Sequence, residues 1–400
     1  MKNWHKLFAL IFLLFILFAY IGCSDRKNPA DTVYPSGNVY CSRINSVFLE
    51  NNLMWNPSTG RNIFVYVPPG YDEADTSTKY PILYFLHGFM DTTLGYIPTT
   101  SDFPYPYGLA QTADRLIATG QIQPMIIAIA DCKSKLGQVV PAGSFYVDSP
   151  SPIPSNPDTS LNGKFESFYV YEVMDVVEES YHVYKDKSYR AIAGHSMGGY
   201  GAFRIAMDYD TLFSIVGSMS GPLSFEYLID LIPGIFTANG IDSATYRDSL
   251  SYKSTDEATR MLFAMAAAFS PHSSGPITSY FIVTPEGTDP YGVDLPFDST
   301  GDTITAVWNR WMTNDIYTIY YATNHIALNS AAIYIDCGDA DEFGFNEQSR
   351  DFYDALASGP GDRFFEEYSG GGYLPADNST YLYYRIEKLL KFVSENFPQP

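Results

Sequence analysis

The chain has 400 residues, of which 46% are hydrophobic and 17% are charged, so it can bury a sizeable core and is not a disordered polymer. This length suggests two or three average domains, or a single α/β domain of about 250–300 residues with insertions. The formal net charge of −21 argues against nucleic acid as a partner and against a polybasic membrane-surface role, because both need clustered lysine and arginine.

The first 23 residues are predicted to be a lipoprotein signal peptide. Two lysines precede an almost unbroken apolar run, residues 7–21, which is short for a membrane-spanning helix. The run ends in GCSD, which resembles a bacterial lipoprotein cleavage site, so Cys23 is expected to be lipidated and to become the N-terminus. By analogy with bacterial lipoproteins, a serine and not an aspartate after the cysteine, here Ser24, favours the outer over the inner membrane of a Gram-negative-type bacterium. An uncleaved membrane anchor or ordinary secretion is the alternative.

Residues 24–38 are polar and contain proline and glycine, which predicts a flexible tether ahead of a domain from residue 39 to residue 400. Beyond Cys23 the cysteines are Cys41, Cys132 and Cys337. Their odd number does not indicate a disulfide framework and their spacing matches no zinc pattern, so we expect three small buried residues and no metal. Cys132 and Cys337 each end a different predicted strand, and we predict that they are not bonded to one another.

Strand and helix patterns alternate along the rest of the chain. Residues 45–55 and 61–71 flank a turn and predict an antiparallel pair of strands. Apolar runs without polar alternation predict strands buried on both faces, at residues 80–88, 124–132, 189–196, 213–221 and 331–338. Apolar residues spaced by three and four predict helices at 165–181 and 381–396, and residues 363–368 read as a further strand. The predicted fold is therefore α/β, with a mostly parallel central sheet and helices on both faces.

Two stretches interrupt this alternation. Residues 133–164 contain a loop rich in proline and serine, and residues 222–330 are too long for a single crossover between strands. We interpret both as cap or lid insertions within one domain.

A nucleophile motif follows the predicted strand that ends near residue 195. The sequence GHSMGGYGA, residues 194–202, contains G-x-S-x-G and opens a helix-compatible stretch. In this strand–turn–helix context the motif predicts a nucleophile elbow at Ser196, with small flanking residues that permit the tight turn. The helix N-terminus then points at the serine, and the Met197 N–H faces developing negative charge. His195 is expected to pack into the sheet.

A second motif, FLHGFMDTT, places Phe89 just beyond the carboxyl end of an earlier strand. In acyl-transfer hydrolases a loop at this position donates the other oxyanion N–H, here that of Phe89. One such donor contributes about 3–4 kcal/mol to transition-state stabilisation. His87 in the same loop is expected to be structural.

The third motif, IYIDCGDADEF at residues 333–343, is a strand that ends in a polar loop. The order serine, then aspartate, then histidine is that of the α/β-hydrolases. Asp341 is the first candidate for the acid that orients a base, Asp339 the second and Asp336 the third. A solvated acidic loop or a casual cation site is the alternative.

Together these stretches resemble the bacterial esterase family of the α/β-hydrolase superfamily that includes esterase D (S-formylglutathione hydrolase), feruloyl esterases and mycolyltransferases. The resemblance is also carried by VYVPPGYDEA, GSFYVDSP, GKFESF, SMSGP and AAAFSP, and runs from about Arg61 to the C-terminus. It implies an α/β-hydrolase fold without a cofactor, with Ser196 as nucleophile and Asp341 as acid. Met197 and Phe89 would supply the oxyanion N–H groups.

The family's catalytic histidine is the feature that this sequence lacks at its usual place. Members typically carry it in a loop like EYSGGH after the last strand, and the corresponding residue of EYSGGG here is Gly372. No histidine follows His325. His272 and His325, which both precede the acid, are the candidates for a substitute base.

Three functions are compatible with these observations. The first is an exported, lipid-anchored serine carboxylic-ester hydrolase that acts on a small-molecule or glycan-linked acyl ester. The second is a hydrolase-fold binding protein without turnover, because loss of the histidine from a triad can cost on the order of a million-fold in turnover. The third is an acyltransferase of the mycolyltransferase type, in which an alcohol accepts the acyl group. Likeness of fold does not choose among them.

Overall fold

The computed structural model describes residues 34–54, 56–91, 93–97, 108–136, 140–240, 242, 257–272, 280–282, 292–323, 328, 330–356, 359–369 and 381–399. Cys23, His325 and Gly372 lie outside the described residues, as does most of the predicted tether. Among the described helices, none combines the length and the apolar composition of a membrane-spanning segment.

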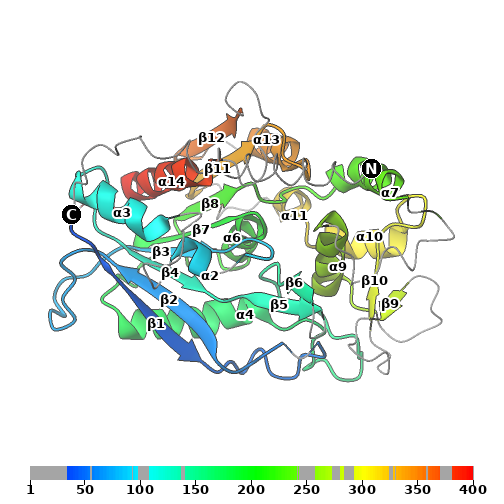
Figure 1. Cartoon of the computed structure of the whole chain (residues 1–400), viewed down its shortest axis with the longest axis horizontal. Helices are drawn as coiled ribbons and strands as arrows, with labels where there is room; N and C mark the ends of the chain where they lie inside the picture. Colours follow the sequence, from blue (N-terminus) through cyan, green and yellow to red (C-terminus); the bar gives the residue numbers. More distant parts are fainter. Residues whose placement is uncertain are drawn as a thin grey trace, which may run out of the picture. The chain divides into compact units, whose positions relative to one another are not determined.

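An eight-stranded sheet organises the described part of the chain (Figure 1). From one edge to the other its order is β1 (Asn38–Ile44), β2 (Arg61–Val67), β4 (Ile126–Ala130), β3 (Ile82–Leu86), β7 (Arg190–His195), β8 (Ile215–Met219), β11 (Ala332–Gly338) and β12 (Arg363–Tyr368). All neighbouring pairs from β4 to β12 are parallel, and β2 pairs antiparallel with both β1 and β4. The predicted mostly parallel sheet is therefore confirmed.

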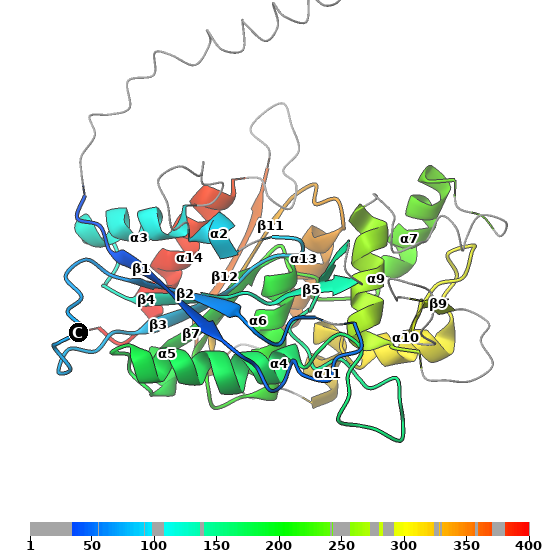
Figure 2. The same ribbon diagram turned by 60° about the horizontal axis from the view of Figure 1, so that its bottom comes forward.

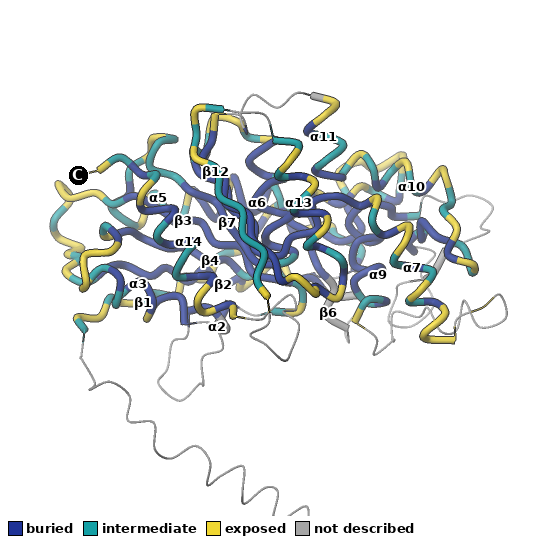
Figure 3. Tube along the Cα trace, turned by 90° about the horizontal axis from the view of Figure 1, so that it is seen from above, coloured by how far each residue is buried: buried dark blue, intermediate teal, exposed yellow. Residues whose placement is uncertain are grey.

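The continuous apolar runs became the central strands because these strands are covered on both faces. All residues of β3, β4 and β8 are buried, whereas β12 at the sheet edge is half-buried along its length (Figure 3). One face packs against α3 (Leu109–Ala118) and α14 (Leu382–Asn396). The other face packs against α4 (Phe165–Ser167), a π-helical turn (Phe168–Val173), α5 (Met174–Ser180), α6 (Met197–Asp208) and α13 (Phe345–Ala355) (Figure 2).

The predicted strand at residues 45–55 is wrong. The partner of β2 is β1, with Asn38 opposite Val67, so the sheet begins at the last residue of the predicted tether. Residues 47–54 form turns, and the backbone N–H groups of Leu53 and Met54 donate to the carbonyls of Ser160 and Leu161. Backbone hydrogen bonds therefore anchor this turn segment to a distant loop.

The two predicted insertions contain further elements. In the first, β5 (Lys133–Leu136) and β6 (Val140–Gly143) form a hairpin. The second contains α7 (Tyr227–Ala238), α9 (Glu257–Phe269), β9 (Tyr280–Ile282), β10 (Gly292–Asp294), α10 (Thr305–Met312) and α11 (Ile316–Thr323). Figure 1 shows the second group gathered at the end of the sheet towards which the parallel strands run. We call this group the cap.

None of the three described cysteines forms a disulfide. Cys132 and Cys337 are buried as predicted, whereas Cys41 on the edge strand β1 is exposed, which corrects the expectation for that residue. The strands that precede Cys132 and contain Cys337, β4 and β11, are separated in the sheet by β3, β7 and β8. Neighbouring strands lie about 4.8 Å apart, so this separation is too large for a disulfide.

Candidate active site

The candidate site lies at the carboxyl edge of four adjacent parallel strands, β3, β7, β8 and β11. Parallel strands end at the same edge of a sheet, so the residues that follow them come together there. Phe89 follows β3, Ser196 follows β7, and Asp341 follows β11. The fold thus brings three of the predicted site residues to one edge.

Ser196 occupies a sharp turn between β7 and α6. Its backbone has φ 53° and ψ −118°, and the positive φ is strained for a residue with a side chain. The turn is held by its N–H, which donates to the Met219 carbonyl over 2.7 Å. A Cβ on Gly198 would lie 2.0 Å from the Leu86 carbonyl oxygen, and a Cβ on Gly194 would lie 2.4 Å from Gly198. The glycines of G-x-S-x-G are therefore required by close backbone packing.

The two predicted oxyanion residues lie near each other. Met197 is the first residue of α6, where backbone N–H groups have no helical acceptor and carry partial positive charge. The Met197 side chain and the Phe89 ring both contact Gly143 of β6, at which a Cβ would lie 2.7 Å from Met197 Sδ and 3.0 Å from the Phe89 ring. The loop after β3 and the start of α6 thus meet beside Ser196.

Asp341 is held by its own loop. Its Oδ1 accepts hydrogen bonds from the N–H groups of Phe343 at 2.9 Å and Phe345 at 3.3 Å, and the side chain is largely buried. Asp339 is exposed, whereas Asp336 is fully buried in an ion pair within the sheet. Asp341 therefore stays the first candidate for the acid.

His272, one candidate for a substitute base, belongs to the cap. Its Nδ1 lies 2.7 Å from Asp294 Oδ1, and the other oxygen of this carboxylate pairs with Arg310. Its backbone N–H donates to the Gly292 carbonyl. These contacts tie His272 to β10 and α10. His325 and Gly372 are not among the described residues, so the geometry of a base at either position stays a prediction.

Residues 57–359 match the family described as "Putative esterase". The chain belongs to this family. Among curated relatives, an endo-1,4-beta-xylanase/feruloyl esterase of Xylanibacter ruminicola is 26% identical over 186 residues, 46% of this chain and 23% of the relative. An esterase of Mycobacterium tuberculosis is 29% identical over 185 residues, 45% of this chain and 32% of the relative. The matches thus span about a quarter to a third of the length of these relatives.

Solved structures of low identity share the fold of this esterase-family chain. A ferulic acid esterase superposes with a TM-score of 0.55 at 20% identity, covering 90% of this chain and 99% of that one. A Staphylococcus aureus serine hydrolase, FphF, gives a TM-score of 0.51 at 16% identity, with coverage of 90% and 99%. The α/β-hydrolase fold predicted from the sequence is confirmed.

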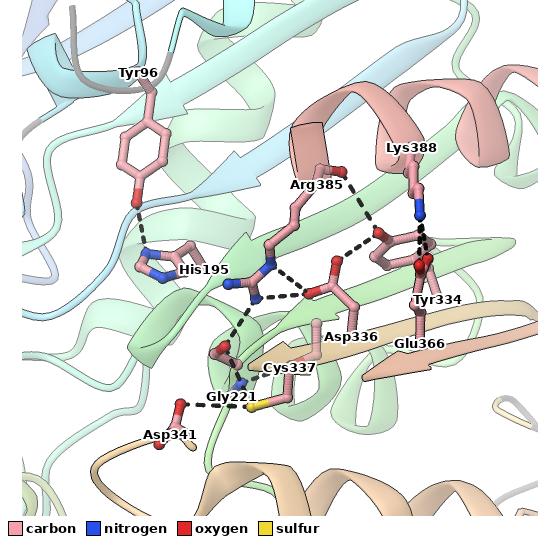
Figure 4. A network of polar contacts seen from close by, with 12 residues as sticks. Tyr96, His195, Gly221, Tyr334, Asp336, Cys337, Asp341, Glu366, Arg385 and Lys388 are labelled. Atoms are coloured by element: carbon pink, nitrogen blue, oxygen red, sulfur yellow. Dashed lines mark hydrogen bonds and ion pairs between the residues drawn. The ribbon is translucent and has the colours of Figure 1, made fainter. Parts of the chain in front are cut away.

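A buried polar network that the sequence did not predict lies beside the loop that follows β11 and carries Asp341, which we call the acid loop (Figure 4). Arg385 of α14 donates to Asp336 Oδ1 from Nη2 at 2.7 Å and from Nε at 3.1 Å, and to Ser220 Oγ at 2.8 Å. Cys337 Sγ lies 3.3 Å from Ser220 Oγ and 3.5 Å from Asp341 Oδ2. Burial raises the pKa of the Cys337 thiol, which therefore keeps its proton. The network connects α14 to the acid loop.

The signal for Arg385 was present in the sequence. The buried residues of α14 recur at three- and four-residue spacing, and Arg385 falls on that face between Leu382 and Leu389. A cation on the apolar face of an amphipathic helix indicates a buried partner, because an unpaired charge there is costly.

A separate cleft of about 540 Å³ is lined by Ser224, Glu226, Tyr227, Ile229, Asp230, Tyr317 and Asp351. Neither Ser196 nor Asp341 lines it, so we do not assign it to the candidate site. Among the residues the structure describes, no group of three or more His, Cys, Asp and Glu side chains is arranged to hold a metal ion.

Proposed function

We propose that this protein is a serine carboxylic-ester hydrolase that works through an acyl-enzyme on Ser196. The observation that carries the proposal is the strained turn at Ser196, which presents the serine at the edge where the Phe89 and Asp341 loops also end. A non-glycine residue keeps a positive φ only where its surroundings enforce it, and such strain is concentrated at functional sites. Membership of the esterase family supports the same assignment.

In this mechanism Ser196 Oγ attacks the acyl carbon of the ester while its proton passes to water or to one of the candidate bases, His272 and His325. The carbonyl electron pair moves to oxygen, and the N–H groups of Met197 and Phe89 donate to that oxyanion. Collapse of the tetrahedral intermediate expels the alcohol and leaves the acyl group on Ser196. Water then attacks the acyl-enzyme and releases the acid. Asp341 would orient the base, and with Gly372 at the usual base position we expect slow turnover.

The proposed substrate is a carboxylic ester of a small acyl group, carried by a small molecule or a glycan. Two relatives bear names that include feruloyl or ferulic acid esterase, which supports aryl acyl groups for this chain. Methyl ferulate and p-nitrophenyl butyrate are therefore suitable test substrates.

We expect the wild type to release p-nitrophenol from p-nitrophenyl butyrate and to be labelled by a fluorophosphonate, and the Ser196→Ala variant to lose both reactions. The physical reason is that Ser196 Oγ is the proposed attacking atom, at the turn where α6 and its Met197 N–H begin. Ser214→Ala is the matched control. Ser214 lies just before the amino end of β8, whereas Ser196 follows the carboxyl end of the neighbouring parallel strand β7. Labelling that persists at full rate in Ser196→Ala would show that another residue is the nucleophile.

The second candidate, a binding protein that retains the hydrolase fold, is favoured by one observation, the glycine at position 372. The size of the p-nitrophenol burst separates the two functions. A burst of one equivalent of p-nitrophenol per protein molecule, followed by slow further release of p-nitrophenol, indicates an acyl-enzyme that water attacks slowly. Binding of methyl ferulate without a burst and without labelling indicates a binding protein.

We further propose that Cys23 is lipidated and anchors the mature protein in a membrane. The support is the sequence alone: a positively charged start, an apolar run and the stretch GCSD. In cells, Cys23→Ala should lose the acyl modification by mass spectrometry and should leave the membrane fraction. Cys41→Ala, which removes an exposed cysteine of the folded domain, should change neither. Unchanged acylation and membrane retention in Cys23→Ala would contradict this proposal.

A further inference from the structure

The loop from His87 to Asp91, which carries Phe89, is held at each end by the hydroxyl of a buried tyrosine. At its amino end, Tyr146 Oη donates to the His87 carbonyl over 3.0 Å. At its carboxyl end, Tyr96 Oη donates to Asp91 Oδ2 over 2.7 Å. Both tyrosines are fully buried. The candidate oxyanion donor therefore lies between two fixed points.

The amino end is fixed by side-chain and backbone groups together. His87 Nε2 accepts a hydrogen bond from the Cys132 N–H at 3.1 Å, so the proton resides on Nδ1, which donates to the Gly88 carbonyl at 2.9 Å. Burial lowers the pKa of His87, which keeps the ring neutral and this pattern intact near neutral pH. The loop is thus tied to the end of β4 as well as to Tyr146.

Tyr146 also contacts the helix that begins after Ser196. Its ring lies against Gly201 of α6, where a Cβ would be 2.5 Å from the ring. Phe145 and Tyr146 both have positive φ, 47° and 53°. Such backbone costs on the order of 1–2 kcal/mol per residue and persists only where the surroundings enforce it. The turn therefore places one side chain against both the nucleophile helix and the loop of Phe89.

The carboxyl end is connected to the residue before the nucleophile (Figure 4). His195 Nδ1 lies 2.9 Å from Tyr96 Oη and 3.5 Å from Asp91 Oδ2. Burial acts to raise the pKa of Asp91, but the contacts with His195 and Tyr96 outweigh it and lower the pKa, so the carboxylate stays ionised. The same carboxylate packs on Gly88, where a Cβ would lie 2.6 Å from Asp91 Oδ2.

We propose that Tyr146 and Tyr96 are positioning residues that hold the Phe89 N–H in place relative to Ser196 Oγ. This inference rests on the proposed function, because the position of that N–H matters only if Ser196 attacks a carbonyl or phosphonyl centre. A displacement of about 1 Å at a reacting centre can cost about 100-fold in rate. The two hydroxyls touch the loop on either side of the donor and take no part in the chemistry.

The test compares Tyr146→Phe with Tyr169→Phe in the full-length protein. Tyr169 is equally buried, its ring lies edge-on to that of Tyr146 with centroids 6.0 Å apart, and its hydroxyl has no hydrogen-bond partner among the described residues. We expect Tyr146→Phe to lower the rate constant of Ser196 phosphonylation and kcat for p-nitrophenyl butyrate by about 10-fold or more, with KM nearly unchanged. Tyr169→Phe should match the wild type. Tyr96→Phe should lower the same two rates.

The fraction of protein labelled by the fluorophosphonate at the end point gives the number of active molecules. Dividing by this number yields a rate constant per active molecule, which a loss of folded protein does not change. Equal rate constants in Tyr146→Phe and Tyr169→Phe, or a rise in KM with kcat unchanged, would overturn the positioning role while the proposed function stands. A wild type that is neither labelled nor acylated at Ser196 would overturn the proposed function and this inference with it.

Discussion

The Gly372→His variant should hydrolyse p-nitrophenyl acetate and butyrate at least about 100-fold faster than the wild type. A general base contributes typically about 10²–10⁴-fold when it takes the proton of the attacking group. The resemblance to the esterase family predicts a catalytic histidine at this position, and in the sequence residue 372 comes shortly after β12, which pairs with β11, the strand ahead of Asp341. Asp341, which would orient the imidazole, and Ser196, whose proton the imidazole would accept, both follow the carboxyl ends of strands in the same sheet.

Three further variants test this expectation. Gly370→His introduces the same side chain two residues earlier and should gain little, since a base must reach the serine proton within hydrogen-bond distance. Gly372→His combined with Ser196→Ala should be inactive. Gly372→His combined with Asp341→Asn should lose most of the gain, because the imidazole is then no longer oriented. A wild type that already turns over at ordinary esterase rates would contradict the expectation, and His272→Ala and His325→Ala would then identify the base in use.

Stability has to be measured beside these rates. If Gly372 adopts a positive φ, a histidine there costs about 1–2 kcal/mol, which circular dichroism and thermal unfolding would report. A folded Gly372→His variant that gains no activity would show that the loop does not bring residue 372 to Ser196.

The sequence predicted the parallel strands well because burial on both faces leaves a one-dimensional signature. Each run without polar alternation, such as 124–132, became a strand whose ends differ from the predicted ones by at most two residues. The nucleophile motif was predictable for a similar reason. A Cβ at Gly198 or Gly194 would lie 2.0 or 2.4 Å from neighbouring backbone atoms, which is closer than a real Cβ can approach, so these positions require glycine.

Two features that the sequence did not predict depend on long-range contacts. Residues 45–55 carry apolar side chains suited to a strand, but the backbone N–H groups of Leu53 and Met54 donate to Ser160 and Leu161, more than a hundred residues later. The proposed positioning role of Tyr146 likewise depends on its hydrogen bond to the His87 carbonyl. Neither partner is visible from local spacing. Arg385 is different, because the local spacing of α14 alone places this cation on the apolar face of the helix.

Arg385→Met should lower the free energy of unfolding by about 3–5 kcal/mol, measured by urea titration with circular dichroism. The substitution leaves Asp336 buried without its cation, and removal of one partner from a buried ion pair is strongly destabilising for this reason. Both side chains of the pair are 0% exposed. Burial acts to lower the pKa of Arg385, but Asp336 outweighs it and raises the pKa, so the guanidinium stays charged.

Lys388→Met is the matched control, because it removes a cation from the same helix three residues later. Lys388 pairs with Glu366, and the two side chains are 42% and 32% exposed, so water solvates either charge when the other is removed. Exposed pairs of this kind contribute about 0–1 kcal/mol, so we expect a change of at most that size. If Arg385→Met lowers the free energy of unfolding by no more than Lys388→Met does, water reaches Asp336. The double variant Arg385→Met with Asp336→Asn should recover much of the loss, since the penalty belongs to the uncompensated charge and not to the absence of the pair.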